Sequence, residues 1–220
     1  MKRSEINGHI RAAEEFFAGH GFHLPAWAHL TPEAWRSVAF DCSEVFERGL
    51  GWDITDFNLG SFERRGLVLF TLRNGKLEPG HKPYAEKAMM VDIDQETPFH
   101  YHWTKIEDII NRAGGTLVLE LAWEDKSTGQ LSEAPVNVSI DGVRRTFTAR
   151  EQVRLSPGES ITLPVELYHR FWAEGDAVLV GEVSMVNDDA GDNRFLEPLP
   201  RFPEITEDEP AERLLVMDYG

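Results

Sequence analysis

Short runs rich in β-branched and aromatic residues, separated by turn signals, occupy most of the chain between residues 53 and 186. The expected strands are 66–72, 84–91, 99–103, 116–123, 136–140, 144–149, 160–163, 168–173 and 177–186. Asp141-Gly142 separates two of them, and glycine accepts the positive φ that a two-residue hairpin turn requires. No helical pattern alternates with these runs, so they predict an all-β antiparallel sandwich or barrel and not a parallel sheet.

The two ends of the chain have different patterns. In the first 50 residues, apolar residues recur at helical spacing after Ser4, which can cap a helix, and Gly19 can end it. Thr31 and Pro32 mark a second start, with Pro32 at the first helical position. After Asn187 the pattern fades into a polar loop, and residues 203–212 form an acidic segment. We therefore predict one domain, 1–220, with an N-terminal helical arm over 1–50, a β-rich core over 51–195 and a C-terminal extension over 196–220.

Charge and composition exclude several classes of protein. The formal net charge of −16 argues against nucleic acid and anionic membranes as partners, because binding to either relies on Lys and Arg. A single cysteine, Cys42, excludes an intramolecular disulfide framework. The basic start has no apolar run behind it, and no apolar stretch approaches the roughly 20 residues of a membrane span. We expect a soluble cytoplasmic protein with no signal peptide and no membrane segment.

Four residues have the types and spacing of a metal site. His100 and His102 are two apart in a strand-like run, so both imidazoles point to the same face. Glu107 follows where the chain would turn back, and His169 begins a later strand. Three imidazoles and one carboxylate leave up to two positions of an octahedron open, as a catalytic metal requires. This ligand set permits Mn²⁺, Co²⁺, Ni²⁺ or Fe²⁺.

Two charged residues lie in runs that are typical of buried strands. An ionised Glu182 in its apolar run is costly unless it meets a cation, a hydrogen-bond partner or a substrate. We interpret Glu182 as a general base near the metal; the alternative is a carboxylate that faces solvent. If Lys87 faces the interior, its ammonium can hold a substrate oxygen; the alternative is a lysine that only keeps a strand edge soluble.

The metal-ligand spacing resembles the two cupin motifs. The pattern H-x-H-x4-E-x6-G from His100 to Gly114 resembles the first, and Gly158-x5-Pro164-x4-His169 resembles the second. Two positions depart from the second motif, with Glu166 where glycine is usual and Ala173 where asparagine is usual. Neither departure removes a ligand, but Glu166 implies a different turn before His169.

Several longer segments resemble the D-lyxose isomerase family of cupins. The segments are LFTLRNG, YAEKAMMV, HYHWTKIEDIINRAGG, LSPGESITLP, LYHRFWAE and VLVGEVSMVNDDAGDNRF. The resemblance implies a cupin-type β-barrel (jelly roll) and a manganese-preferring aldose–ketose isomerase. It implies D-lyxose and D-mannose as free-sugar substrates, with D-xylulose and D-fructose as products, and a homodimer. The negative net charge agrees with a neutral sugar, because a phosphate site needs clustered Arg or Lys.

The loop after the strand of Glu182 offers further substrate contacts. Asp188, Asp189, Asp192 and Arg194 would reach the barrel mouth, where loops supply the directed hydrogen bonds that sugars need. The alternative is a solvated turn. With one metal and one base, we expect a cis-enediol route, in which Glu182 moves a proton from C2 to C1 and Lys87 steadies an oxygen.

Two other functions stay open at this point. A metal-dependent cupin dioxygenase could use the same three histidines and glutamate to hold iron. A non-catalytic sugar-binding cupin would tolerate replacement of Glu182 with a loss of affinity only. Metal analysis, oxygen consumption and ketose formation separate these functions from the isomerase.

Overall fold

Two long antiparallel strands, β5 (Glu107–Asp125) and β11 (Leu167–Met185), form the middle of the sheet in the computed structural model, which describes residues 1–38, 42–189 and 191–219. Gly114 and Gly115 lie where β5 approaches β11 most closely. An added Cβ there would lie 2.0 Å and 2.3 Å from backbone oxygens of β11. Only glycine fits this approach, which gives Gly114 of the first motif a structural reason.

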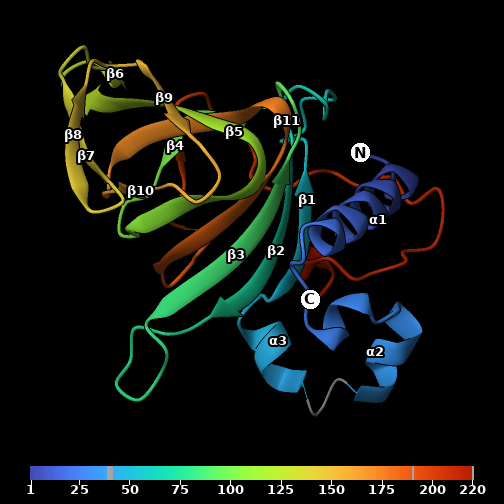
Figure 1. Ribbon diagram of the computed structural model, residues 1–220. Coiled ribbons are helices and arrows are strands. Elements are labelled where there is room, and N and C mark those ends of the chain that lie inside the picture. Colours follow the sequence, from blue (N-terminus) through green and yellow to red (C-terminus); the bar gives the residue numbers. More distant parts are fainter. Residues whose placement is uncertain (39–41, 190, 220) are drawn as a thin grey trace.

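The halves of β5 and β11 have different outer neighbours. The first half of β5 pairs with β10 (Ser160–Leu163), and the second half of β11 pairs with β3 (Tyr84–Val91). The second half of β5 pairs with β9 (Gln152–Leu155), and the first half of β11 pairs with β4 (His100–Tyr101). The sheet therefore curves over itself and encloses an interior (Figure 1).

The sheet has 12 strands, in the order β1-β2-β3-β11-β5-β10-β7-β8, with four more beside this path. Every pair of these strands is antiparallel. The other strands are β1 (Gly51–Thr55), β2 (Leu67–Asn74), β6 (Gln130–Leu131), β7 (Val136–Ile140), β8 (Val143–Phe147) and β12 (Arg194–Phe195). The helices are α1 (Arg3–Gly19), η1 (Ala26–His29), α2 (Pro32–Val38), α3 (Ser43–Glu47) and η3 (Val216–Tyr219).

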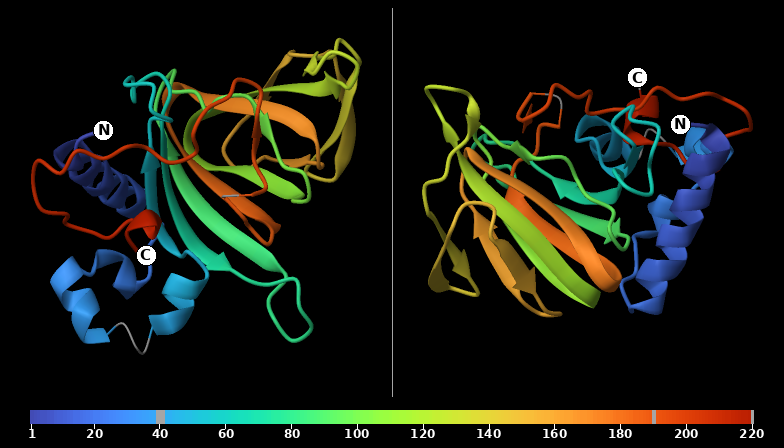
Figure 2. Two further views of the ribbon diagram at one scale, coloured as in Figure 1. Left: turned by 180° about the vertical axis from the view of Figure 1, so that it is seen from behind. Right: turned by 90° about the horizontal axis from the view of Figure 1, so that it is seen from above.

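The interior is filled largely by apolar side chains. Leu117, Leu119, Leu155 and Ile161 are at most 1% exposed and belong to one cluster that spans both layers of the curved sheet. Helix α1 covers the outer face of β1, β2 and β3 (Figure 2). Phe17 of this helix packs there in a second cluster. None of the described helices is both long and apolar enough to cross a bilayer.

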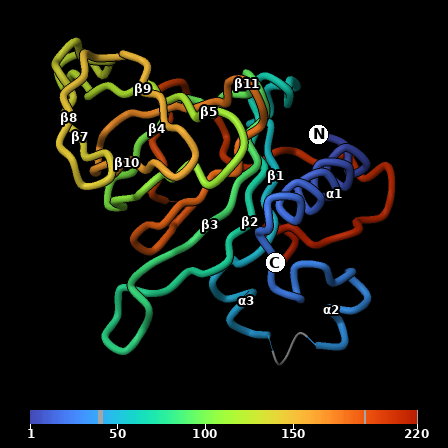
Figure 3. Tube along the Cα trace, viewed as in Figure 1, coloured from blue at the N-terminus to red at the C-terminus, as the bar shows by residue number. Residues whose placement is uncertain are grey.

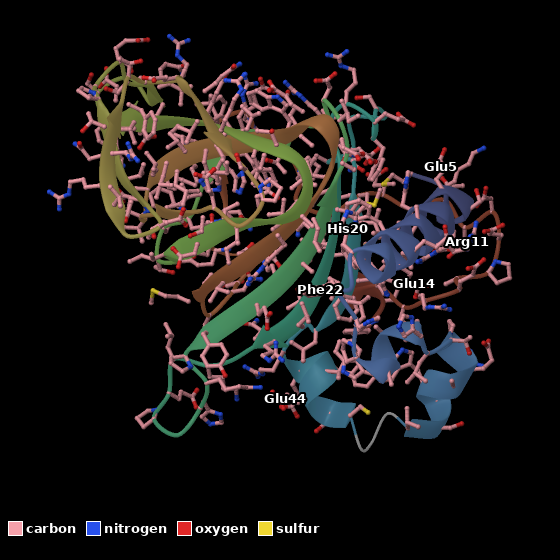
Figure 4. All side chains as sticks on the ribbon, viewed as in Figure 1. Glu5, Arg11, Glu14, His20, Phe22 and Glu44 are labelled. Atoms are coloured by element: carbon pink, nitrogen blue, oxygen red, sulfur yellow. The ribbon has the colours of Figure 1, made fainter. Side chains whose placement is uncertain are left out.

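The C-terminal segment, residues 196–219, returns along α1, as the tube in Figure 3 shows. The buried Arg3 pairs with Glu207 at 2.7 Å. Glu14, labelled in Figure 4, pairs with Arg213 at 3.1 Å. Ion pairs therefore join the two ends of the chain.

The mostly antiparallel β fold with an N-terminal helix is confirmed. Asp141 and Gly142 have φ values of 49° and 78°, so the expected hairpin turn is present. Helix α2 begins at Pro32 as predicted, and Thr31 Oγ1 accepts the N–H of Ala34 at 3.2 Å. The division into arm, core and extension stays a prediction.

Other expectations at element ends were wrong. Lys2, and not Ser4, is the N-cap of α1, because the Ser4 hydroxyl donates to Asp208 at 2.7 Å. The expected strands 168–173 and 177–186 are one strand, β11. The Gly175 turn signal is accommodated by a register shift within this strand.

Candidate metal centre and active site

Three histidines converge on one point inside the curved sheet. His100 lies in β4, directly opposite His169 in β11, and His102 follows β4. Their ligand atoms all lie within 4.8 Å of one another. His102 and His169 are buried and His100 is half-buried. The predicted histidines are therefore brought together by strand register and by the two-residue spacing.

The hydrogen bonds of these rings fix the direction of their lone pairs. Each Nδ1 lies close to a backbone carbonyl oxygen, which can only accept, so each Nδ1 carries the hydrogen. The acceptors for His100, His102 and His169 are Pro98 O at 2.8 Å, Asp192 O at 2.9 Å and Leu167 O at 3.0 Å. Burial, helped by the two neighbouring imidazoles, lowers the pKa of His100 well below its usual value. With Nδ1 as the donor, Nε2 is the nitrogen of each ring that is left to bind a cation.

Glu107 completes this donor set from the first residue of β5. Its Oε1 lies 3.1 Å from Nε2 of His169, and its Oε2 lies 3.5 Å from Nε2 of His102. Oε1 is buried and has no hydrogen-bond donor within the described part of the chain. Lone pairs that face each other at this distance repel unless a cation lies between them. The residues therefore fit a divalent metal, and the three histidines could bind it.

Lys105 is a site residue that the sequence analysis missed. Its Nζ lies 2.9 Å from Oε2 of Glu107 and 2.8 Å from Oε1 of Glu182, and its side chain is 2% exposed. Burial opposes its charge, but the two carboxylates outweigh burial and raise the pKa of Lys105. In return, Lys105 holds the pKa of Glu107 well below its usual value despite burial. The i, i+2 spacing to Glu107 is the signal that could have found it.

Glu182 and Lys87 lie directly opposite each other in β11 and β3, and both side chains point into the site. Oε1 of Glu182 is 3.6 Å from Nζ of Lys87, and the side chains are 6% and 4% exposed. Although burial raises the pKa of Glu182, Lys105 and Lys87 outweigh burial and lower it. The solvent-facing alternative is therefore wrong for both residues, and Glu182 is an ionised carboxylate.

The four loop residues lie in different places. Asp189 lines the pocket, 3.5 Å from Nζ of Lys87. Asp192 is buried, and its carboxylate accepts the backbone N–H groups of Thr104 at 2.9 Å and Lys105 at 3.1 Å. Asp192 thus fixes the turn between His102 and Glu107. That position differs from the expected one at the barrel mouth.

Asp188 and Arg194 are not among the side chains that line this pocket in the described residues. Asp188 lines a neighbouring cavity of about 460 Å³, and its Oδ1 accepts the N–H of Gly191 at 3.0 Å. Arg194 is exposed, and the neighbouring Tyr168 raises its pKa. Of the four predicted loop residues, Asp189 alone lines the pocket described here, and substrate contacts for all four stay a prediction.

The pocket between these groups has a volume of about 50 Å³, room for only a few water molecules. Apolar side chains of β2, β3 and β5 form part of its wall. Arg201, from the C-terminal segment, also lines it and pairs with Asp53 of β1. No pattern around Arg201 or Asp53 pointed to the site, because they approach it from distant parts of the chain.

Glu166, which replaces the usual motif glycine, does not change the turn as we expected. Its φ is 60°, in the left-handed region that glycine favours. Its N–H donates to His102 O at 2.8 Å, which ties this turn to the other metal-binding segment. The chain therefore keeps a glycine-like conformation before His169, at some cost in backbone strain.

Comparison with known proteins agrees with this geometry. A family model described as D-lyxose isomerase matches residues 1–219. A protein of Escherichia coli O157:H7 named D-lyxose/D-mannose isomerase is 52% identical over 225 residues, covering 100% of this chain and 98% of that protein. A protein of the same name from Serratia proteamaculans is 50% identical, again over 100% of this chain and 98% of the relative.

The chain belongs to the D-lyxose isomerase family. The fold of this member resembles solved L-ribose isomerases. With the Cellulomonas parahominis enzyme without ligand, the TM-score is 0.61 at 15% identity, covering 94% of this chain and 98% of that chain. With the Geodermatophilus obscurus enzyme the TM-score is 0.60 at the same identity and coverage. At this identity the likeness concerns the fold alone.

Proposed function

We propose that this member of the D-lyxose isomerase family interconverts D-lyxose and D-xylulose, and D-mannose and D-fructose, by proton transfer. One observation carries the proposal. A buried carboxylate, Glu182, is held ionised by Lys105 and Lys87 in the same small pocket on which three imidazoles converge. The names of the two full-length relatives support the choice of sugars.

His100, His102, His169 and Glu107 would hold a divalent ion, Mn²⁺ by preference, and Co²⁺, Ni²⁺ and Fe²⁺ suit the same donors. When bound, such an ion polarises the carbonyl and adjacent hydroxyl of an open-chain sugar. The inward lone pairs of the imidazoles and the unpartnered Glu107 Oε1 support this assignment.

Glu182 is the proposed general base. An ionised carboxylate can accept the proton from C2 and return it to C1 through a cis-enediol. Nζ of Lys105 and Nζ of Lys87 lie 2.8 Å and 3.6 Å from Oε1 of Glu182. These two ammonium groups can stabilise negative charge that develops on a sugar oxygen. The apolar wall of the pocket excludes water, which strengthens these interactions.

The same proposal includes the closure of the sheet into a barrel, the sugar contacts of the loop residues and the assembly into a dimer. The curved sheet is a cupin-type barrel. The metal ligands of the first cupin motif lie around β4 and at the start of β5, and the ligand of the second motif lies in β11. Asp188, Asp189 and Arg194 make sugar contacts at its mouth, and Asp192 supports the site by holding the turn between His102 and Glu107. The enzyme works as a cytoplasmic homodimer on a free sugar.

The test is ketose formation by protein that has been stripped with a chelator and reloaded with Mn²⁺. We expect ketose from D-lyxose and D-mannose, and little from D-xylose. D-xylose differs from D-lyxose only at C2, and its C2 hydrogen points away from a base fixed on one side of the pocket. Oxygen uptake is measured in parallel. Oxygen consumption without ketose would favour a dioxygenase, and sugar binding with neither reaction would favour a non-catalytic cupin.

A further inference from the structure

Arg201 enters the pocket on a segment that has no role in the metal centre. Its side chain is 11% exposed and lines the pocket. Nη2 lies 2.5 Å from Oδ2 of Asp53 and 3.8 Å from Oδ1 of Asp189. Asp53 is itself buried in β1, so a charge pair fixes the guanidinium in place.

The other terminal nitrogen of Arg201, Nη1, is buried and has no hydrogen-bond acceptor within the described residues. A guanidinium has five N–H donors in a fixed fork, and leaving buried donors unpaired is costly. Asp53 occupies one side of this fork. Arg201 lines the pocket, so a ligand with acceptor oxygens in the pocket could pair with its guanidinium.

A row of alternating charges connects Arg201 to Glu107 of the metal site through four other side chains. The row runs from Glu107 through Lys105, Glu182, Lys87 and Asp189 to Arg201. The distances between the nitrogen and oxygen atoms of successive pairs along this row are 2.9, 2.8, 3.6, 3.5 and 3.8 Å. If the reacting carbons lie at Glu182, as the proposed function requires, a sugar that extends along this row away from Glu107 brings its far end toward Arg201.

We propose that Arg201 is a specificity-determining residue, whose guanidinium donates to the hydroxyl at the end of the sugar remote from the reacting carbons. Asp53 is the positioning residue that holds the guanidinium in this orientation. The inference rests on the proposed isomerase function. It assigns the C-terminal segment a part in choosing the substrate, in addition to its packing along α1.

The test compares kcat/KM for D-lyxose and for 5-deoxy-D-lyxose, which lacks only the terminal hydroxyl. The parent should prefer D-lyxose by about 10- to 100-fold, the range expected for a hydrogen bond to a charged group. Arg201→Lys keeps a charge for Asp53 but has no forked donor. It should lose most of this factor on D-lyxose, largely in KM, and little on the deoxy sugar. Metal content should not change.

Arg213→Lys is the matched control. Arg213 is also in the C-terminal segment, is 19% exposed and pairs with Glu14, but it is not among the residues that line the pocket. This variant should keep the preference of the parent. Equal losses on both sugars in Arg201→Lys would overturn the proposal. So would a parent that does not distinguish the two sugars, a result that needs no variant to fold. A parent that isomerises neither sugar would instead refute the proposed function.

Discussion

The interior of the curved sheet has an apolar region and a charged region that share the same strands. Around Leu119, Leu155 and Val136, side chains are fully buried and apolar. At the start of β5 and the end of β11, Glu107 and Glu182 are nearly as buried, at 3% and 5% exposure. The two regions are equally inaccessible, but their chemistry is opposite.

This difference separates stability from function. The apolar region stabilises the fold, because each side chain is removed from water without leaving a polar group unpaired. Burying charges costs free energy that pairing only partly returns, so apolar replacements of a buried ion pair are often neutral or stabilising. The charged region is therefore explained by the reaction that it supports. Replacements in the two regions should have separate effects on turnover and on stability.

The largest effect is expected for His169→Ala. Loss of one imidazole should remove the bound metal and reduce turnover to the background rate, since the metal supplies the polarisation of the sugar. Metal content and ketose formation are measured on the same sample. His81→Ala is the control, because His81 is exposed and outside the triad. Full metal and full turnover in His169→Ala would remove this residue from the ligand set.

Glu182→Gln should have the next largest effect. The variant keeps shape and metal but cannot take a proton, so turnover should fall about 10²- to 10⁴-fold. The melting temperature should fall modestly, since Lys105 and Lys87 lose one charge partner but keep Glu107 and Asp189. Glu86→Gln is the matched control, because Glu86 belongs to β3 but pairs with Arg73 away from the pocket. Turnover within about threefold of the parent would make Glu182 a structural residue.

Leu119→Ala tests the apolar region and should show the reverse pattern. The side chain is fully buried, so its truncation should lower the free energy of unfolding by about 2–5 kcal/mol through lost burial and a cavity. Metal content and turnover of the folded protein should change little. Leu77→Ala, at a leucine that is 64% exposed, is the control. A stable Leu119→Ala variant with impaired turnover would contradict the separation of the two regions.

The sequence predicted those parts of the site that depend on local spacing. His100 and His102 are two residues apart, so alternation along a strand places both imidazoles on one face, and the turn after His102 brings Glu107 to them. Lys105 could have been found by the same rule, which we applied to the histidines only. Its position two residues before Glu107 places both side chains on one face.

The remaining site residues depend on tertiary structure. Asp53 and Arg201 are 148 residues apart, and only the return path of the C-terminal segment joins them. Asp192 was interpreted as a sugar ligand because acidic loops are typical of barrel mouths. Its carboxylate instead accepts two backbone N–H groups, a role that no local sequence pattern predicts. Glu166 was misjudged because a non-glycine residue can still adopt a left-handed conformation.

The most direct test of proton transfer at the charged region is the isomerisation of D-lyxose in heavy water, analysed at low conversion. A proton held on the Glu182 carboxylate can exchange with solvent before it is returned, so D-xylulose should carry deuterium at C1. Incorporation below one deuterium per product agrees with this route, because a closed pocket can return the same proton. D-xylulose without deuterium at every pH and temperature, together with an active Glu182→Gln variant, would contradict proton transfer and favour a hydride shift.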